Sequence, residues 1–140
     1  MRRTAGGVLC KNDRLLLARR RHDRPYYPGV WDIIGGHARD CESPEDTLRR
    51  ELREEPGVVP VCFREIGVFA EPHPEKYGEG EHHMFVVTEW IGDPHNLCPD
   101  EHERIAWFSS RELRELDLAS REYLLILGAL YSVASNGETR

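Results

Sequence analysis

The sequence lacks closely spaced cysteine pairs, long hydrophobic runs, internal repeats and low-complexity segments. Its four cysteines, Cys10, Cys41, Cys62 and Cys98, lie far apart and form no Cys-x-x-Cys motif, so we expect reduced thiols. The longest apolar stretch, residues 123–133, is well short of the ~20 residues that span a bilayer. The first residues are too polar for a secretory hydrophobic region. These absences predict a cytoplasmic protein without a membrane partner.

Positive charge is also scarce relative to negative charge. The chain has 19 basic and 25 acidic residues, for a formal net charge of −6. A surface that holds polymeric nucleic acid carries an excess of positive charge, so we expect no such partner. The acidic balance suits a centre in which carboxylates surround a divalent metal. The 140 residues are sufficient for one domain, 1–140, with a hydrophobic core, and residues from about 134 to 140 are expected to form a frayed tail.

The pattern of apolar residues predicts strands on both sides of one central helix. Two strands, Thr4 to Cys10 and Arg14 to Ala18, are expected to be joined by a turn at residues 11–13. Glu71 to Gly80 reads as a surface loop, rich in proline and glycine. Further elements follow the same rules: strands at Val58 to Phe69, Glu81 to Trp90 and Arg104 to Phe108, a short helix capped by Ser109 and Glu112, and a last helix opened by Ser120.

The central helix lies within residues 31–58 and carries its acids in one sector. Ser43 is a suitable N-cap, and Pro56-Gly57 ends the helix. At about 100° per residue, Leu48 and Leu52 form an apolar stripe that must face a core. Glu51, Glu54 and Glu55 lie in a sector beside that stripe. A charge run is more often a solvated helix face, but like charges at this spacing reduce stability unless a cation lies among them.

The spacing of the residues around these acids decides between the two interpretations. The fixed positions are Gly36, Glu42, Arg50-Glu51-Leu52, Glu54-Glu55 and Gly57-Val58. This pattern resembles the signature of the Nudix hydrolase family, and the length and order of elements are similar to those of its MutT-like members. The resemblance implies an α/β/α sandwich with a mixed β-sheet and a loop-helix-loop signature. Strands interrupted by one helix and followed by terminal helices independently indicate a mixed sheet covered on both faces.

The resemblance also implies a Mg²⁺ site, with Mn²⁺ as a substitute. Carried over by position, its ligands are the carboxylates of Glu51, Glu54 and Glu55 and the backbone carbonyl of Gly36. Glu51 and Glu54 are then also catalytic residues. Magnesium prefers such oxygen ligands, and the double glycine Gly35-Gly36 permits the close backbone approach that a carbonyl ligand needs.

Other residues complete the predicted site. The family's signature arginine and first glutamate brace the loop against the helix, which maps to Arg50 and Glu42. A glutamate from a distant loop commonly binds metal or serves as base, and Glu101 is the first candidate, followed by Glu103 and then Glu71. Guanidinium groups bind phosphate oxygens, so Arg19 or Arg20 is expected to contact substrate, although a solvated loop is an equal alternative. Tyr26 or Tyr27 either stacks on a base or packs within its own loop.

Three residues depart from the family pattern. Ile34 stands where proline is common before the double glycine, and Cys41 where glycine is common before the first glutamate. If that site needs a positive φ, Cys41 strains the loop. Pro56 disfavours helical geometry at the residue before it, so we expect Glu55 to be turned away from its orientation in the family.

The resemblance implies hydrolysis of a nucleoside diphosphate linked to another group. A nucleoside triphosphate, including an oxidised one of the 8-oxo-dGTP type, is the first substrate expected, with a monophosphate and pyrophosphate as products. ADP-ribose or a nucleotide sugar is the alternative, since Pro74 lies about where ADP-ribose hydrolases of the family carry proline, and dinucleoside polyphosphates come third. A nucleotide-binding module with impaired catalysis is the alternative from another class. Family members commonly form dimers, so a homodimer is an implied assembly.

Overall fold

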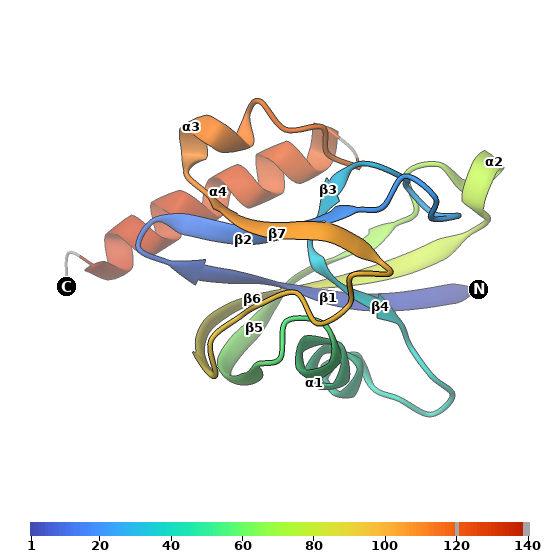
Figure 1. The fold of residues 1–140 in the computed structure, drawn as a ribbon, viewed down its shortest axis with the longest axis horizontal. Coiled ribbons are helices and arrows are strands. Elements are labelled where there is room, and N and C mark those ends of the chain that lie inside the picture. The colour runs from blue at the N-terminus through green and yellow to red at the C-terminus, as the bar shows by residue number, and fades with distance from the viewer. Residues whose placement is uncertain (120, 139–140) are drawn as a thin grey trace.

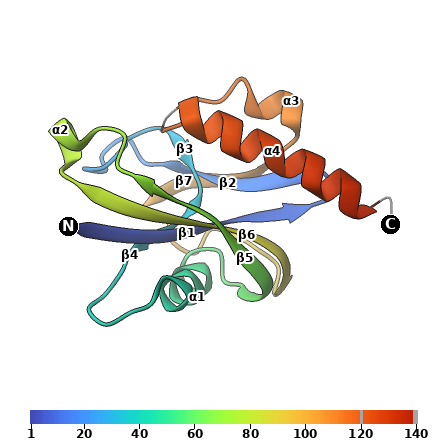
Figure 2. The same ribbon diagram turned by 180° about the vertical axis from the view of Figure 1, so that it is seen from behind.

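Seven strands of the described residues form one mixed β-sheet (Figures 1 and 2). The structure is a computed structural model that describes residues 1–119 and 121–138, with side chains described as far as residue 131. The strand order is β3-β2-β1-β6-β5, with β4 paired to β1 and β7 paired to β2. Only the β1–β6 pair is parallel among the described pairs. The strands are β1 (Arg2–Lys11), β2 (Arg14–Arg20), β3 (Trp31–Asp32), β4 (Ile34–His37), β5 (Val59–Ala70), β6 (Gly80–Ile91) and β7 (His102–Phe108).

One edge of β1 pairs with two different strands. This pairing fixes the position of the segment that contains Gly35 and Gly36, which we call the glycine loop. Leu9 to Lys11 pair with β2, while Thr4 to Gly7 pair with β4. The short strand β4 therefore lies beside the first half of β1, and it holds Gly35 and Gly36 against residues 5 and 6.

Helices cover both faces of the sheet (Figures 1 and 2). Helix α1 (Pro44–Glu54) covers one face, and α3 (Ser110–Leu113) and α4 (Arg121–Glu138) cover the other. The short helix α2 (Pro74–Tyr77) follows β5. None of the helices in the described residues is long and apolar enough to cross a membrane.

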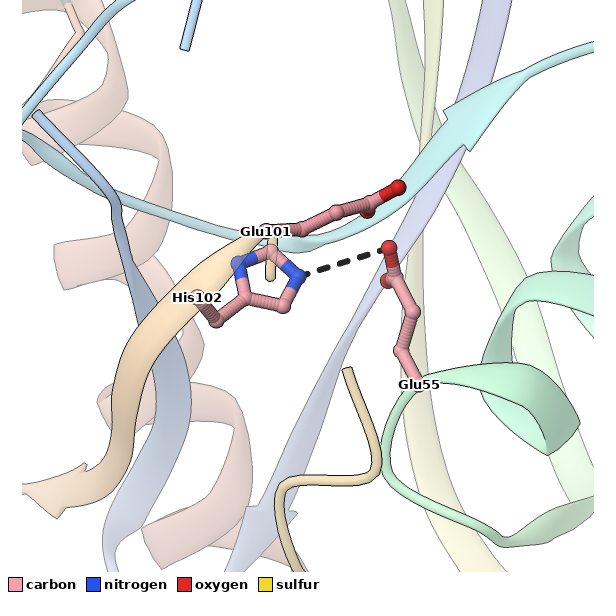
Figure 3. A group of neighbouring side chains, drawn as sticks. All are labelled: Glu55, Glu101 and His102. Atoms are coloured by element: carbon pink, nitrogen blue, oxygen red, sulfur yellow. Dashed lines mark ion pairs between the residues drawn. The ribbon is translucent and has the colours of Figure 1, made fainter. Parts of the chain in front are cut away.

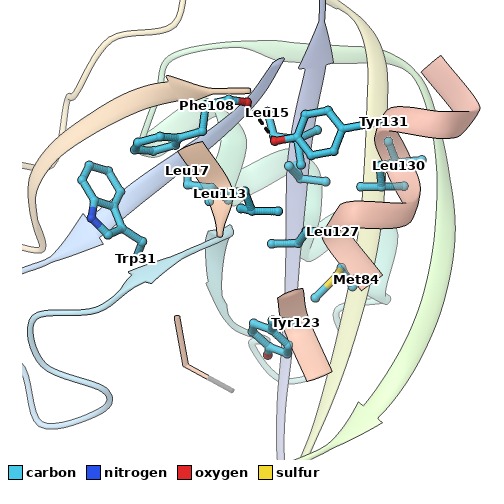
Figure 4. Close-up of a cluster of buried hydrophobic side chains, with 12 residues drawn as sticks. Leu15, Leu17, Trp31, Met84, Phe108, Leu113, Tyr123, Leu127, Leu130 and Tyr131 are labelled. Atoms are coloured by element: carbon cyan, nitrogen blue, oxygen red, sulfur yellow. Dashed lines mark hydrogen bonds between the residues drawn. The ribbon is translucent and has the colours of Figure 1, made fainter. Parts of the chain in front are cut away.

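Two hydrophobic clusters hold these layers together. Successive side chains of a strand point to opposite faces, so Leu15 and Leu17 of β2 belong to one cluster, and Leu16 and Ala18 to the other. The cluster under α4 is shown in Figure 4. There Tyr131 donates a hydrogen bond to the carbonyl of Phe108 at 2.8 Å, which ties α4 to the end of β7. The cluster under α1 includes both leucines of the apolar stripe predicted for that helix.

Most of the predicted elements are confirmed, including the turn between β1 and β2, with differences at two places. The β1–β2 turn has Asn12 and Asp13 at φ 54° and 58°, a conformation that Asn and Asp tolerate better than most residues. The predicted loop after β5 contains α2. Helix α4 extends to Glu138, through most of the segment for which the sequence predicts a frayed tail. The predicted opening of this helix at Ser120 lies outside the described residues.

Candidate functional site

Helix α1 is fixed at its start and along its apolar side. The Ser43 hydroxyl accepts a hydrogen bond from the amide of Asp46 at 3.1 Å, and Pro44 occupies the first helical position. Leu48 and Leu52 are fully buried in the cluster beneath the helix. Their packing sets the rotation of the helix, and with it the direction in which its glutamates point.

Arg50 braces the glycine loop against the helix. Its guanidinium donates to both carboxylate oxygens of Glu42, at 2.7 and 2.9 Å, and to the carbonyl of His37 at 2.9 Å. It also contacts Glu51 at 2.8 Å and Glu54 at 3.3 Å. The hydrogen bonds from Arg50 hold the pKa of Glu42 at about 2, so that carboxylate stays ionised. This geometry is the bracing that the sequence predicts for Arg50 and Glu42.

Glu51 lies directly on Gly36. A Cβ placed on Gly36 would be 2.5 Å from Glu51 Oε1, which is closer than non-bonded atoms approach. Burial raises the pKa of Glu51, while Arg50 counteracts part of that rise. Because Gly36 has no side chain, the buried carboxylate of Glu51 can lie directly against the backbone there.

Glu55 keeps its helical backbone, so the expectation that Pro56 turns it away is wrong. Its φ and ψ are −90° and −64°, and its amide donates to the carbonyl of Glu51 at 2.9 Å. The bias that proline places on the preceding residue is outweighed here by this bond and by the turn that follows. Gly57 takes a φ of 76°, and the amide of Val58 bonds to the carbonyl of Leu52 at 2.9 Å. Glu55 is only 3% exposed.

Glu55, Glu101 and His102 form a cluster where α1 meets the start of β7 (Figure 3). One potential ligand atom from each of the three lies within 4.8 Å of the others. His102 Nε2 is 3.3 Å from Glu55 Oε1, and both residues are almost completely buried. The chain segments involved are far apart in sequence, and only folding brings them together.

The electrostatic environment of the cluster shifts the pKa values of its two carboxyl groups in opposite directions. Burial raises the pKa of Glu55 to about 10, and a hydrogen bond with Glu101 and the charges of Glu51 and Glu101 add to this rise. Burial opposes ionisation of Glu101 too, but the hydrogen bond from Glu55 and the charge of Arg24 lower its pKa overall. Burial lowers the pKa of His102 to about 4, so its imidazole is neutral. These shifts favour a protonated Glu55 hydrogen-bonded to an ionised Glu101, beside a neutral His102 imidazole.

Several buried polar atoms of this cluster have no hydrogen-bond partner among the described residues. They are Glu55 Oε2 and both ring nitrogens of His102. Unpartnered buried polar groups are rare and reduce stability, whereas carboxylate oxygen and neutral imidazole nitrogen are metal ligands. The cluster therefore fits a divalent cation. Sequence reasoning missed His102, and the only signal for it was its place directly after Glu101 at the start of a strand.

Two other predicted acids lie outside this three-residue cluster. Glu54 is half-exposed and lies 3.7 Å from Arg39 and 3.3 Å from Arg50. Glu103 contacts Arg19 at 3.6 Å and His22 at 3.4 Å, away from the buried cluster. Of the two distal candidates after β6, the structure thus brings Glu101 to the helix.

A cavity of about 270 Å³ opens beside this cluster. Gly36, Glu51 and Glu101 line it, so two of the site's acids border the cavity. Of the two arginines predicted to contact substrate, Arg20 lines the cavity, whereas Arg19 pairs with Glu103. Arg24, Tyr26 and Tyr27 also line the cavity.

Glu71 lines the same cavity but does not belong to the Glu55–Glu101–His102 cluster. Its buried carboxylate accepts hydrogen bonds from the Tyr27 hydroxyl, from Arg2 at 2.8 Å and from the amide of His73 at 2.9 Å. His82 Nε2 lies 3.2 Å from it. These contacts occupy both oxygens of Glu71, which makes it a support for Tyr27 and not a distal metal ligand.

Comparisons with known proteins identify a matching domain family, similar sequences and similar structures. A model of the NUDIX domain matches residues 1–126. Nucleoside triphosphatase NudI of Salmonella paratyphi B is 30% identical over 142 residues, which cover 91% of this chain and 98% of that protein. The crystal structure of a MutT NUDIX hydrolase from Burkholderia pseudomallei has a TM-score of 0.80 at 24% identity, over 90% of this chain and 95% of that one. The NUDIX domain of Shewanella oneidensis NrtR, complexed with ADP ribose, has a TM-score of 0.75 at 20% identity, over 94% and 87%.

Proposed function

Because this chain belongs to the NUDIX hydrolase family, we propose that it is a metal-dependent pyrophosphohydrolase that splits a nucleoside triphosphate into a monophosphate and pyrophosphate. The observation that carries the proposal is the Glu55–Glu101–His102 cluster, whose Glu101 also lines a cavity together with arginine and tyrosine side chains. The similarity to the nucleoside triphosphatase NudI supports this substrate class.

The donor set suits a divalent metal. Glu55 and Glu101 are the first ligands, with Glu51 and the Gly36 carbonyl beside them and Glu54 at the exposed end of the same helix. Mg²⁺, or Mn²⁺ in its place, would neutralise phosphate charge and polarise the attacking water.

The chain's own residues supply the other parts of the reaction. The lowered pKa of Glu101 keeps its carboxylate ionised and able to accept a proton from water. Oxygen of that water then bonds to phosphorus, the bridging P–O bond breaks, and pyrophosphate leaves with the electron pair. Arg20, Arg24, Tyr26 and Tyr27 line the cavity. The two arginines would bind phosphate oxygens, and the two tyrosines would stack on a base.

A product assay with purified protein and saturating Mg²⁺ tests the proposal. The panel contains unmodified and oxidised nucleoside triphosphates, ADP-ribose, nucleotide sugars and diadenosine polyphosphates. Pyrophosphate and a monophosphate from one triphosphate would support the proposal and identify the base. AMP and ribose phosphate from ADP-ribose would move the chain to the alternative substrate class, and nucleotide binding without turnover would indicate a module with impaired catalysis.

Variants of the acidic residues test which of them are needed for the reaction. Glu54→Gln, Glu55→Gln and Glu101→Gln are each expected to lower kcat by orders of magnitude while the protein stays folded, because these groups act through charge. Glu103→Gln is the matched control, since Glu103 is a neighbouring acid that pairs with Arg19 outside the cluster. Near wild-type rates for the first three variants would refute the assignment of the metal ligands.

A further inference from the structure

His102 is the least satisfied polar side chain of the cluster. It is 3% exposed, and neither ring nitrogen has a hydrogen-bond partner among the described residues. Its backbone is nevertheless held on both sides: the amide bonds to the carbonyl of Cys98 at 3.0 Å, and the carbonyl accepts from Asn96 at 2.9 Å. The loop before β7 thus fixes a buried imidazole in a place where it gains no hydrogen bond.

The imidazole ring of His102 faces Glu55, a second buried group with an oxygen that lacks a hydrogen-bond partner in the described part of the chain. Glu55 Oε2 also lacks a partner among the described side chains, and Glu55 Oε1 lies 3.3 Å from His102 Nε2 (Figure 3). That contact is close enough for an ion pair, but its alignment does not make a hydrogen bond. Two unsatisfied groups that face each other across this distance are better explained by a shared ligand than by direct pairing.

We propose that His102 is a nitrogen ligand of the divalent cation held by Glu55 and Glu101, and that it makes this site prefer Mn²⁺ and the later first-row metals over Mg²⁺. The inference rests on the proposed function, which requires a metal at these acids. It adds a ligand that the signature does not contain, because His102 lies beyond Gly36–Val58 in the sequence.

The separations in the cluster suit a shared cation. Adjacent corners of an octahedron with ligand distances of roughly 2.1 Å are roughly 3 Å apart, and opposite corners roughly 4 Å apart. The 3.3 Å between His102 Nε2 and Glu55 Oε1 corresponds to adjacent corners. The 4.8 Å limit that encloses all three ligand atoms also leaves room for the ion between them.

The chemistry of the donor gives the selectivity. Magnesium binds oxygen ligands and releases its water reluctantly, so an imidazole adds little to its affinity. Affinity for nitrogen donors rises from Mn²⁺ through Fe²⁺ and Co²⁺ along the first transition row. A site made only of carboxylates has no nitrogen donor and would not distinguish Mn²⁺ from Mg²⁺ in this way. The preference for Mn²⁺ over Mg²⁺ should therefore depend on His102.

Pulsed electron paramagnetic resonance of Mn²⁺ tests the ligand directly. Full-length protein without a histidine tag is loaded with substoichiometric Mn²⁺, and the echo envelope is examined for modulation by a directly bound ¹⁴N nucleus. We expect this modulation in the wild type, its loss in His102→Gln, and its retention in His95→Gln. His95 is a suitable control because it is an exposed histidine of the same loop, whose ring contacts the Asp93 carbonyl at 2.8 Å.

Titration calorimetry with Mn²⁺ and Mg²⁺ measures the selectivity. His102→Gln should weaken Mn²⁺ binding about tenfold or more and Mg²⁺ binding by less than about threefold. Equal losses for both ions, or wild-type Mn²⁺ without ¹⁴N modulation, would overturn the proposal and leave His102 as a support of Glu55. The wild-type spectrum decides the question even if His102→Gln fails to fold.

The same titrations separate this inference from the proposed function. If Mn²⁺ binds the wild type and Glu55→Gln abolishes that binding, the metal centre stands, and only the role of His102 is under test. If the wild type binds neither ion, or if Glu55→Gln binds as the wild type does, the metal centre itself is refuted, and this inference is refuted with it.

Discussion

At the scale of single residues, two side chains near the site occupy left-handed backbone. Tyr27 has a φ of 48° and Cys41 a φ of 66°, a region that L-residues other than Asn and Asp rarely adopt. Tyr27 gains a hydrogen bond to the buried Glu71 in return. Cys41 is exposed, and its conformation is set by the loop that brings Glu42 to Arg50. The strain that the sequence predicted for Cys41, if its φ were positive, is therefore present.

Replacing Cys41 with glycine should stabilise the protein. The left-handed conformation is unfavourable by about 1–2 kcal/mol for an L-residue, and glycine loses about 0.4–1 kcal/mol more conformational entropy on folding. The net increase in the free energy of unfolding should be about 0.5–1 kcal/mol, measured by urea denaturation. Cys62→Gly, at an exposed position of β5, is the control and should instead destabilise by about 0.5–1 kcal/mol. A loss of stability in Cys41→Gly would contradict the strain argument.

Metal binding at the cluster should release a proton. The pKa of Glu55 is raised to about 10, so this carboxyl is protonated at pH 8, and a carboxylate must lose its proton to bind a cation. About one proton should leave per Mg²⁺ bound at pH 8, and the apparent affinity should rise as the pH approaches 10. Calorimetry in buffers of different ionisation enthalpy measures this number. A value of zero in the wild type would show that Glu55 is already ionised.

The residues that sequence could identify are those within one continuous segment. Gly36, Glu42 and Arg50 follow fixed spacings along a loop and a helix, so their contacts with one another are local and predictable. His102 could not be identified in this way, because its importance arises only where β7 packs beside α1. The partners of Glu71 could not be identified for the same reason, because Arg2 and Tyr27, which hold its carboxylate, are distant from it in sequence.

At the scale of elements, the pairing of β4 with β1 sets the position of the glycine loop. Gly35 lies opposite Gly6, and Gly36 opposite Ala5. A Cβ on Gly35 would be 2.2 Å from the carbonyl oxygen of Ala5, whereas a Cβ on Gly36 would meet only the Glu51 carboxylate, at 2.5 Å. The first contact is with backbone and the second with a movable side chain, so the two glycines have different roles.

The two alanine variants should separate stability from activity. Gly35→Ala should lower the free energy of unfolding by about 1–3 kcal/mol or more, because the strand pair must shift. Gly36→Ala should retain more stability and lose turnover, because Glu51 is displaced from its place beside the cavity. Urea denaturation and kcat, measured on both proteins, test this contrast. Full activity in Gly36→Ala would show that the position of Glu51 is not critical.

The segment after β5 shows where element prediction from sequence ends. Its prolines and glycines correctly indicated an interruption between two strands. They gave no sign of α2, whose tyrosine at residue 77 lies against Tyr26 and Tyr27 with ring centroids 5.6 and 4.5 Å apart. Amino-acid composition indicates that a segment turns. It does not indicate which aromatic side chains from other parts of the fold pack against that segment.

At the scale of the whole molecule, the sheet separates two hydrophobic cores that support different helices. The sandwich was predictable because apolar residues alternate along the strands and recur at helical spacing in α1 and α4. The strand order was not, since the parallel pairing of β1 with β6 depends on contacts between distant segments. The core under α1 supports the helix that carries the acids, while the core under α4 lies on the opposite face.

Alanine substitutions in the two cores should therefore differ in their effect on activity. Leu127 of α4 and Leu52 of α1 are both 0% exposed, so each change to alanine should lower the free energy of unfolding by about 2–5 kcal/mol. Well below the unfolding transition, Leu127→Ala should keep a near wild-type kcat, whereas Leu52→Ala should lose activity because the helix holding the acids shifts. Leu125→Ala, at a position 76% exposed, should change stability by less than about 0.5 kcal/mol. Equal loss of kcat in the two core variants, measured at matched folded fraction, would show that the sheet transmits packing changes from one face to the other.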